Sequence, residues 1–330
     1  MSSECSIKVV IAEDAIHQLN RVLEDYKRPL IVTDVMIFDK YSQLVEDLVD
    51  ADVIWSISPD HKKGLVSSFS DVDIIIGFGG GKSIDLAKIF ANEAGLDWIS
   101  VPTAASHDGI ASDVASIMHN SYRYSAKCKQ PKVILADLSI MATAPRILTK
   151  SGIGDIISKT SSLAEWRLAH EHAGEPLDKE VYEIVSRSLE SVIRSDDLET
   201  LVRSVIDTGN AMTAFGSSRP CSGTEHAISH AMDRRMQSLH GIQVAFATPL
   251  SLFFLEKAGY AEHGSKEIKE FIRKHGIPVT LKDLDMSKDM FLDDIHHALK
   301  IMNKRERYSV LKHCNVADDE ILQALSELGY

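Results

Sequence analysis

Residues 72–85 read VDIIIGFGGGKSID, an apolar run that passes directly into a glycine cluster and then into a helix-forming segment. The run predicts a buried strand, and the glycines predict a tight strand-to-helix turn. Similar strands, separated by segments with helical spacing, are predicted at residues 7–11, 29–34, 53–57, 98–101 and 132–137. Continuous apolar strands that alternate with helices indicate a parallel sheet covered on both faces. Ligands of such sheets bind beyond the carboxyl ends of the strands.

The glycine cluster differs from two familiar phosphate-binding loops. A Walker A loop requires glycine where Ile76 stands, and a GxGxxG loop counted from Gly77 requires glycine at Lys82. Glycines after a strand still let the backbone approach a ligand closely, and the free N–H groups of the following helix favour an anion. Residues 79–85 can therefore form a phosphate site or a plain strand-to-helix turn.

Two polar groups follow predicted strands at the same edge of the sheet. Asp34 suits the hydroxyls of a ribose, which favours NAD over NADP, but a single aspartate after a strand is as often a helix cap. The loop at residues 102–112, PTAASHDGIAS, follows the fifth strand, and loops at this edge often carry function. Asp108 in this loop can bind a ligand or act as the N-cap of a turn.

From Leu148 onward the apolar residues recur at spacings of three and four, which predicts a helical second half. We place the domain boundary at this change of period, because no Gly/Ser/Pro-rich linker or internal repeat marks it. The expected domains are an α/β domain over residues 1–147 and a helical domain over residues 148–330. A short polar helix is also expected at residues 62–68.

Composition limits the class of partner. The chain has 330 residues, of which 44% are hydrophobic and 25% charged, as in soluble globular proteins. Its formal net charge of −12 argues against nucleic acid or an anionic membrane. The four cysteines form no CxxC pair, and no apolar run approaches the roughly 18–20 residues of a membrane span. Without a signal-peptide pattern at the start, we expect a cytoplasmic protein.

Residues 222–241, SGTEHAISHAMDRRMQSLHG, contain the best candidate metal ligands. His226 and His230 are four residues apart and share a helix face, and His240 follows after enough residues to finish that helix and turn back. Imidazole binds divalent metals such as zinc, and catalytic zinc usually has three protein ligands. Histidine pairs at this spacing are more often ordinary side chains, and no HExxH or HxxEH peptidase motif is present. Asp155, in the sequence GIGD, can cap a helix or supply an oxygen ligand to the same site.

In combination the motifs are specific. GGGKSID, PTAASHDG, GIGD and Hx3Hx9HG occur in the order and at the distances that resemble the dehydroquinate-synthase-like, iron-containing alcohol dehydrogenase superfamily, and most of all its archaeal glycerol-1-phosphate dehydrogenases. The resemblance covers the chain from about residue 30 to residue 255. It implies a Rossmann-like NAD(P)-binding α/β domain followed by an all-α metal domain, with the active site in the cleft between them.

The resemblance also implies roles for individual residues. The dinucleotide would be bound by Gly79, Gly80, Gly81, Lys82, Ser83, Ile84, Asp85, Thr103, Ala104, Ala105, Ser106 and Ser112, in addition to Asp34. The metal ligands would be Asp155, His226 and His240, and the catalytic residues that also contact substrate would be Asp108, Asp155 and His230. Iron-dependent relatives have a further histidine where Lys159 stands, which favours zinc, although nickel and iron accept the same ligands. Arg219, in the block SSRP, is a candidate phosphate anchor or an ordinary salt-bridged arginine.

The implied reaction is the NAD(P)H-dependent, zinc-assisted reduction of dihydroxyacetone phosphate to sn-glycerol 1-phosphate, the backbone of archaeal membrane lipids. The metal would act as a Lewis acid on the C2 carbonyl, and His230 or His107 could help to supply the proton. A homo-oligomer without stable membrane insertion is expected. The alternatives are a glycerol or polyol dehydrogenase, a phosphate-eliminating cyclase of the dehydroquinate synthase type, which the sparse Lys and Arg near Asp155 and His226 disfavour, and a nucleotide-binding regulatory protein with structural histidines.

Overall fold

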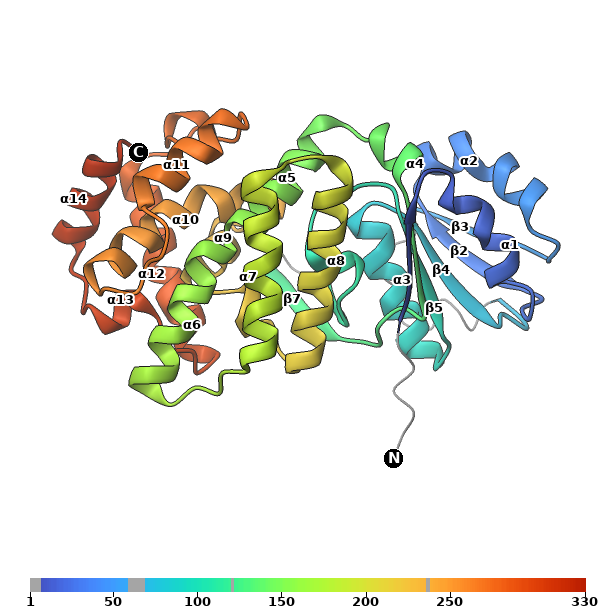
Figure 1. Ribbon diagram of the computed structural model, residues 1–330, viewed down its shortest axis with the longest axis horizontal. Coiled ribbons are helices and arrows are strands. Elements are labelled where there is room, and N and C mark those ends of the chain that lie inside the picture. Colours follow the sequence, from blue (N-terminus) through green and yellow to red (C-terminus); the bar gives the residue numbers. More distant parts are fainter. Residues whose placement is uncertain (1–6, 59–68, 120–121, 236–237) are drawn as a thin grey trace. The chain divides into compact units, whose positions relative to one another are not determined.

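The computed structural model describes residues 7–58, 69–119, 122–235 and 238–330 (Figure 1). The chain divides into two compact units. The first contains Met1–His119, Tyr124–Thr149 and Asp197–Asn210, and the second contains Asn120–Arg123, Lys150–Asp196 and Ala211–Tyr330. Unlike a single cut at residue 147, this division groups a helical segment from the second half of the sequence with the sheet. The helix expected at residues 62–68 lies outside the described residues.

A six-stranded parallel sheet forms the centre of the first unit and confirms the predicted α/β class. Its spatial order is β1-β8-β5-β4-β2-β3, and every neighbouring pair is parallel. The strands are β1 (Lys8–Ala12), β2 (Pro29–Thr33), β3 (Ile54–Ile57), β4 (Ile74–Gly79), β5 (Trp98–Pro102) and β8 (Val133–Asp137). Each of them overlaps a strand predicted from an apolar run.

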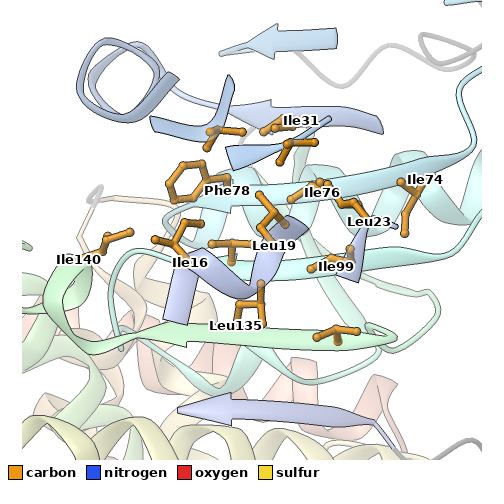
Figure 2. Close-up of a cluster of buried hydrophobic side chains, with 14 residues drawn as sticks. Ile16, Leu19, Leu23, Ile31, Ile74, Ile76, Phe78, Ile99, Leu135 and Ile140 are labelled. Atoms are coloured by element: carbon orange, nitrogen blue, oxygen red, sulfur yellow. The ribbon is translucent and has the colours of Figure 1, made fainter. Parts of the chain in front are cut away.

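Side chains from alternate strand positions fill two separate cores. On one face, Ile31, Ile76 and Phe78 pack against helices from both ends of the α/β segment (Figure 2). These are η1 (Ala15–Gln18), α1 (Leu19–Val22), α2 (Val35–Leu48) and α4 (Leu138–Ala142). On the other face, Leu30 and Ile75 pack against α3 (Gly81–Ala94). Burial on both faces explains why these strands read as continuous apolar runs and not as alternating ones.

A two-stranded sheet lies between β5 and β8 in the sequence, where we predicted no strand. Its strands are β6 (Val114–His119) and β7 (Tyr122–Lys127), and a short 3-10 helix, η3 (Asp108–Ile110), precedes them. These strands carry Ser, His, Arg and Lys among their apolar residues. Such short, mixed strands lack the apolar run by which the central strands were recognised.

The second half of the chain is helical, as predicted. Its elements are α5 (Arg146–Ile157), α6 (Lys159–Ala173), α7 (Lys179–Arg194), α8 (Leu198–Phe215), η4 (Arg219–Cys221), α9 (Thr224–Met232), α10 (His240–Lys257), α11 (Ser265–Lys274), η5 (Lys282–Leu284), α12 (Lys288–Lys304), α13 (Val310–His313) and α14 (Asp318–Leu328). In the described part of the chain, no helix has both the length and the apolar character needed to cross a membrane.

One helix boundary differs from the expectation in a way that affects the candidate site. One of the two interpretations of Asp155 in the sequence GIGD was a helix cap, but α5 begins at Arg146 and contains Gly152, Gly154 and Asp155 in its second half. Asp155 is therefore not an N-cap. Its carboxylate projects from the interior of a helix, and the glycines before it need another explanation.

Candidate functional site

The ends of β2, β4 and β5 lie side by side at the carboxyl edge of the sheet in the first unit. β4 ends at Gly79, where an added Cβ would lie 2.7 Å from Ser83 Oγ, and so only glycine fits. Gly80 is the N-cap of α3 and has no heavy atom within 4 Å of the position of an added Cβ. The N–H groups of the first turn of α3 face this glycine turn, which is the arrangement that accepts a phosphate group.

Asp34 lies beside the same turn. One carboxylate oxygen, Oδ1, accepts a hydrogen bond from the backbone N–H of Ile37 at 3.0 Å and caps α2. The other oxygen, Oδ2, lies 3.6 Å from the position that a Cβ on Gly79 would occupy. The cap interpretation is therefore correct. It does not exclude a contact with ribose, because each role uses a different oxygen.

The polar loop after β5 is tied to the glycine turn. The Thr103 N–H donates to the carbonyl of Gly79 at 3.0 Å. Farther along, His107 caps η3 by accepting a hydrogen bond from the Gly109 N–H at Nδ1, so the expected N-cap role of Asp108 is wrong by one residue. An added Cβ on either Gly81 or Gly109 would come within 2.3 Å of the His107 ring. The imidazole thus fills the space between the start of α3 and the loop.

A buried lysine holds this loop in place. Lys88 has no exposed surface, and its ammonium donates to Asp85 and to the carbonyls of Gly109 and Val114. Asp85 also accepts from the Ser116 N–H, so its carboxylate serves the fold. The side chain of Ile84 belongs to the core against the sheet. Of the predicted phosphate segment, the backbone of the first turn and the exposed Lys82 are therefore the best ligand-facing groups.

The other predicted dinucleotide residues are buried. The exposed fractions are 2% for Ala104 and Ala105, 5% for Ser106, 1% for Ser112 and 6% for Ser83. The segment of α8 grouped with the sheet covers part of this loop, because an added Cβ on Gly209 would lie 2.4 Å from the Asp108 carbonyl.

The second unit brings together the three predicted metal ligands. Asp155 comes from α5, His226 from α9 and His240 from the first position of α10, and one ligand atom of each lies within 4.8 Å of the others. Among the described residues this is the one group of three or more His, Cys, Asp or Glu side chains with such geometry. The His226 and His240 ring centroids are 5.0 Å apart, and those of His230 and His240 are 6.0 Å apart. The three imidazoles converge as the spacing predicts.

Glycine brings two of these elements into backbone contact. An added Cβ on Gly241 would lie 1.8 Å from the carbonyl oxygen of Ser151, and one on Gly154 would lie 2.3 Å from the carbonyl oxygen of Gly241. The Gly241 N–H also donates to Ser151 Oγ at 3.2 Å. No side chain fits between α5 and α10 at this point. Asp155 and His240 follow and precede these glycines directly, so the contact sets the distance between two candidate ligands.

Hydrogen bonds orient both candidate histidine ligands. His226 Nδ1 lies 2.7 Å from Glu225 Oε1, and the same carboxylate accepts from Ser161 Oγ and the Gly223 N–H. Burial alone would raise the pKa of Glu225, but the hydrogen bond and charge of His226 outweigh it and lower that pKa. An ionised Glu225 fixes a proton on Nδ1 and leaves the Nε2 lone pair for a metal.

The imidazole of His240 has a weaker hydrogen-bond partner than that of His226. Ser229 Oγ donates to Gln243 Oε1 at 2.9 Å and lies 3.4 Å from His240 Nδ1. A hydroxyl that donates to Gln243 can accept from His240 Nδ1, which leaves Nε2 of His240 available to a metal. The donor set of one carboxylate and two imidazole nitrogens therefore fits a divalent ion such as zinc.

Lys159 stands where a further histidine was considered. Its ammonium lies 2.9 Å from Asp155 Oδ1, and the two side chains have exposed fractions of 0% and 1%. A lysine ammonium cannot be a metal ligand, which agrees with a three-ligand site. Pairing also offsets the cost of burying a carboxylate. His230, on the last turn of α9, is a neutral group in this neighbourhood because burial lowers its pKa.

Arg219 follows the second of its two predicted alternatives. It is 4% exposed, its Nε donates to Glu175 at 2.6 Å, and its guanidinium also reaches the carbonyls of Glu165 and Tyr308. Glu165 Oε1 lies 3.5 Å away. These contacts use guanidinium N–H groups that a phosphate would need. Arg219 is therefore a structural arginine that joins η4 to α6.

Comparisons with known proteins point to one family. A model of the family described as iron-containing alcohol dehydrogenase matches residues 10–145. The glycerol-1-phosphate dehydrogenase of Hyperthermus butylicus is 32% identical, with 92% of this chain and 91% of that protein covered. The enzyme of the same name from Methanoregula boonei is 33% identical over 92% of this chain and 88% of its own. The chain belongs to the glycerol-1-phosphate dehydrogenase family.

Two solved structures share the fold of this chain. A probable glycerol dehydrogenase from Sinorhizobium meliloti superposes with a TM-score of 0.76 at 21% identity, covering 97% of this chain and 96% of that chain. Glycerol dehydrogenase from Schizosaccharomyces pombe gives a TM-score of 0.72 at 20% identity, covering 98% and 91%. At these identities the likeness concerns the fold alone.

Sequence reasoning missed several residues that shape the site of this family member. Glu225 was given no role in the sequence analysis, although a carboxylate next to a candidate histidine ligand is a usable signal. Lys88 was not singled out from the sequence, because its burial depends on contacts with residues 21 and 26 positions away. The backbone contact at Gly154 and Gly241 joins residues 87 positions apart and has no local signature.

The helix contact gives the first prediction. Gly241→Ala should lower the free energy of unfolding by about 1–3 kcal/mol or more, because a methyl group would overlap the Ser151 carbonyl. It should also reduce the metal bound per chain, since α10 carries His240. Urea unfolding and elemental analysis measure the two effects. Gly95→Ala, at a left-handed glycine with open space, is the control and should cost only about 1–2 kcal/mol without loss of metal. Normal stability and metal content in Gly241→Ala would refute this reading of the contact.

The orientation of His226 gives the second prediction. Glu225→Gln keeps the shape of the side chain but removes the charge, so the affinity for zinc should fall roughly 10- to 100-fold. Competition with a chromophoric chelator measures this affinity. Glu180→Gln, an exposed change on α7, is the matched control. Equal zinc affinities in the two variants would mean that Glu225 does not orient the ring.

Glu165 gives a prediction about pH. Burial is the largest influence and, against the opposing effect of Arg219, raises the pKa of Glu165 to about 7. Because this pKa is raised in the folded state, the native protein binds more protons than the unfolded chain between pH 4.5 and 7. The stabilisation is complete below about pH 4.5 and is lost as the pH rises toward 7. The free energy of unfolding should fall over this range by up to about 3 kcal/mol more in the wild type than in Glu165→Gln. Parallel pH profiles from urea titrations would contradict the assignment.

Proposed function

We propose that this protein is an NAD(P)H-dependent glycerol-1-phosphate dehydrogenase, which reduces dihydroxyacetone phosphate to sn-glycerol 1-phosphate with the help of zinc. The observation that carries the proposal is the cluster of Asp155, His226 and His240 on three helices of the second unit. The proposal is supported by two proteins of this name, which are 32% and 33% identical to this chain over 92% of its length. In this role the product would feed archaeal membrane lipid synthesis in the cytoplasm.

The first unit would bind the dinucleotide. The glycine turn at Gly79 and Gly80 leaves room for a diphosphate, and the N-terminal dipole of α3 favours its negative charge. Asp34 Oδ2 would accept a hydrogen bond from a ribose hydroxyl. A carboxylate there disfavours the extra phosphate of NADP, so the proposal includes a preference for NAD(H). Thr103 would line the nicotinamide side.

The second unit would bind the metal and the substrate. When bound, the metal ion supplies Lewis-acid polarisation of the substrate carbonyl. Glu225 and Ser229 hold the two rings with Nε2 directed inward, and Lys159 balances part of the charge of Asp155. His230 is kept neutral by burial, so it can both donate and accept a hydrogen bond with a substrate hydroxyl. Asp108, which belongs to the first unit, is proposed as a further substrate contact.

Zinc is proposed over iron because a lysine, and not a further histidine, pairs with Asp155. Nickel or iron can occupy the same donor set, and the metal identity is open to direct measurement. A homo-oligomer is part of the proposal on the strength of the family resemblance alone.

The proposal is tested by following NADH and NADPH oxidation with dihydroxyacetone phosphate and with dihydroxyacetone. The phosphorylated substrate should give the higher kcat/KM, and a strong chelator should abolish turnover, with zinc restoring it. His226→Ala should lose zinc and turnover while binding of NADH, followed by its fluorescence, persists. Equal kcat/KM for the two substrates would instead favour a polyol dehydrogenase. Full activity in metal-free protein would remove the metal from the mechanism.

A further inference from the structure

A substrate with a phosphate group needs a cationic partner in the protein. Arg219, the candidate from the sequence, already pairs with carboxylates. Arg219 is held by Glu175 and Glu165. The chain as a whole carries a formal net charge of −12, so a phosphate dianion requires a local basic group. If the proposed function holds, on which this inference rests, a residue of the second unit supplies that basic group.

Helices α9 and α12 pack side by side in opposite directions. In the first half of α12, Asp294 accepts from Arg234 at 2.8 Å and Arg235 at 2.9 Å, and both arginines follow the end of α9. Beyond the other end of α12, Arg307 donates to the carbonyl of Ser222, just before α9 begins. Hydrogen bonds at both ends of α9 therefore fix the antiparallel register of α9 and α12.

Arg305 lies at a defined place in this register. It is the first residue after α12, where its backbone N–H bonds to the Ile301 carbonyl, and it stands two positions before Arg307. Because Arg307 reaches the residue before α9, Arg305 is level with the first turns of α9. His226 lies on the first turn of α9, and His230 lies on the last turn of this short helix. The charge of Arg305 is one of the influences that, after burial, lower the pKa of His230.

Arg305 differs from the neighbouring arginines in having no partner within the described part of the chain. Arg219, Arg234 and Arg235 each pair with carboxylates, and Arg307 donates to Ser218 and Ser222. The Arg305 side chain forms no hydrogen bond or ion pair with any residue in the described ranges. More than a third of its surface is exposed, yet protein atoms crowd it enough that desolvation lowers its pKa. No carboxylate offsets that cost.

We propose that Arg305 binds the phosphate group of the substrate and is the residue that selects a phosphorylated triose over an unphosphorylated one. A guanidinium is planar and can donate two parallel hydrogen bonds to phosphate oxygens. Arg307 has a different role. Its hydrogen bonds to Ser218 and Ser222 hold the segment that carries Arg305 against the start of α9.

A simpler role for Arg305 is to complement the negative end of the α12 dipole. Lys304, the last residue of α12, is exposed and offers the same charge at the same helix end. Lys304→Gln is therefore a matched control that removes an equal charge one residue away. A phosphate contact and a general electrostatic effect give different results in this pair.

The test compares the wild type, Arg305→Gln and Lys304→Gln in the zinc-loaded enzyme. Arg305→Gln should lower kcat/KM for dihydroxyacetone phosphate roughly 10- to 100-fold, as expected for loss of hydrogen bonds to a charged group. It should leave kcat/KM for dihydroxyacetone unchanged and weaken inhibition by inorganic phosphate. Lys304→Gln should behave like the wild type in all three measurements.

The outcomes separate this inference from the proposed function. If the wild type shows no preference for the phosphorylated substrate, the proposed function fails. If the wild type shows the preference and Arg305→Gln keeps it, the function stands and the role of Arg305 is overturned. Equal losses in Arg305→Gln and Lys304→Gln would also overturn it, because they would indicate long-range electrostatics.

A second measurement uses the unaltered enzyme and does not depend on the folding of a variant. Phenylglyoxal modifies accessible arginines, and mass spectrometry reports the extent at each residue. Inorganic phosphate should protect Arg305 in the enzyme loaded with zinc and NAD. Arg194, whose side chain is 78% exposed, should be modified equally with and without phosphate. Equal modification of Arg305 in both conditions would overturn the inference.

Discussion

The contact between α5 and α10 is the constraint on which the candidate metal site depends. The backbones of two helices come into direct contact only where neither helix has a side chain at the contact. Gly154 on α5 and Gly241 on α10 meet this condition. Asp155 and His240 are the immediate neighbours of these glycines. A carboxylate and an imidazole from segments 85 residues apart are thus placed by backbone packing and not by a flexible loop. Packed backbone is rigid, and rigidity is what a metal ligand set requires.

Around this contact, each buried charge has a partner of opposite sign or a hydrogen-bonded ring. Asp155 pairs with Lys159, Glu225 with His226, and Arg219 with Glu175. Burying a single charge would cost several kcal/mol, so these groups are interdependent. The pairing also explains why Arg219, next to the candidate metal ligands in the sequence, is not free to bind a ligand, while Arg305, which has no partner among the described residues, is the better candidate.

The first unit uses a different physical device. In a parallel sheet the carboxyl ends of neighbouring strands lie at one edge, and this places Asp34, Gly79 and Thr103 together although they are far apart in the sequence. Lys88 then fixes the polar loop by donating hydrogen bonds to the carbonyls of Gly109, in the loop, and Val114, at the start of β6. A buried ammonium that satisfies backbone acceptors keeps the loop ordered without any ligand.

The sequence by itself determined the central strands, the helical second half, the family and the convergence of three histidines. Those features are encoded locally, in apolar runs, in periods of three and four, and in motif spacing. Only the tertiary structure decided that Asp155 lies within a helix, that Arg219 is bound by Glu175, and that His107 caps the loop turn. It also revealed the pair β6 and β7, whose mixed composition has no clear period. Partners distant in sequence decide such features, and no local pattern records them.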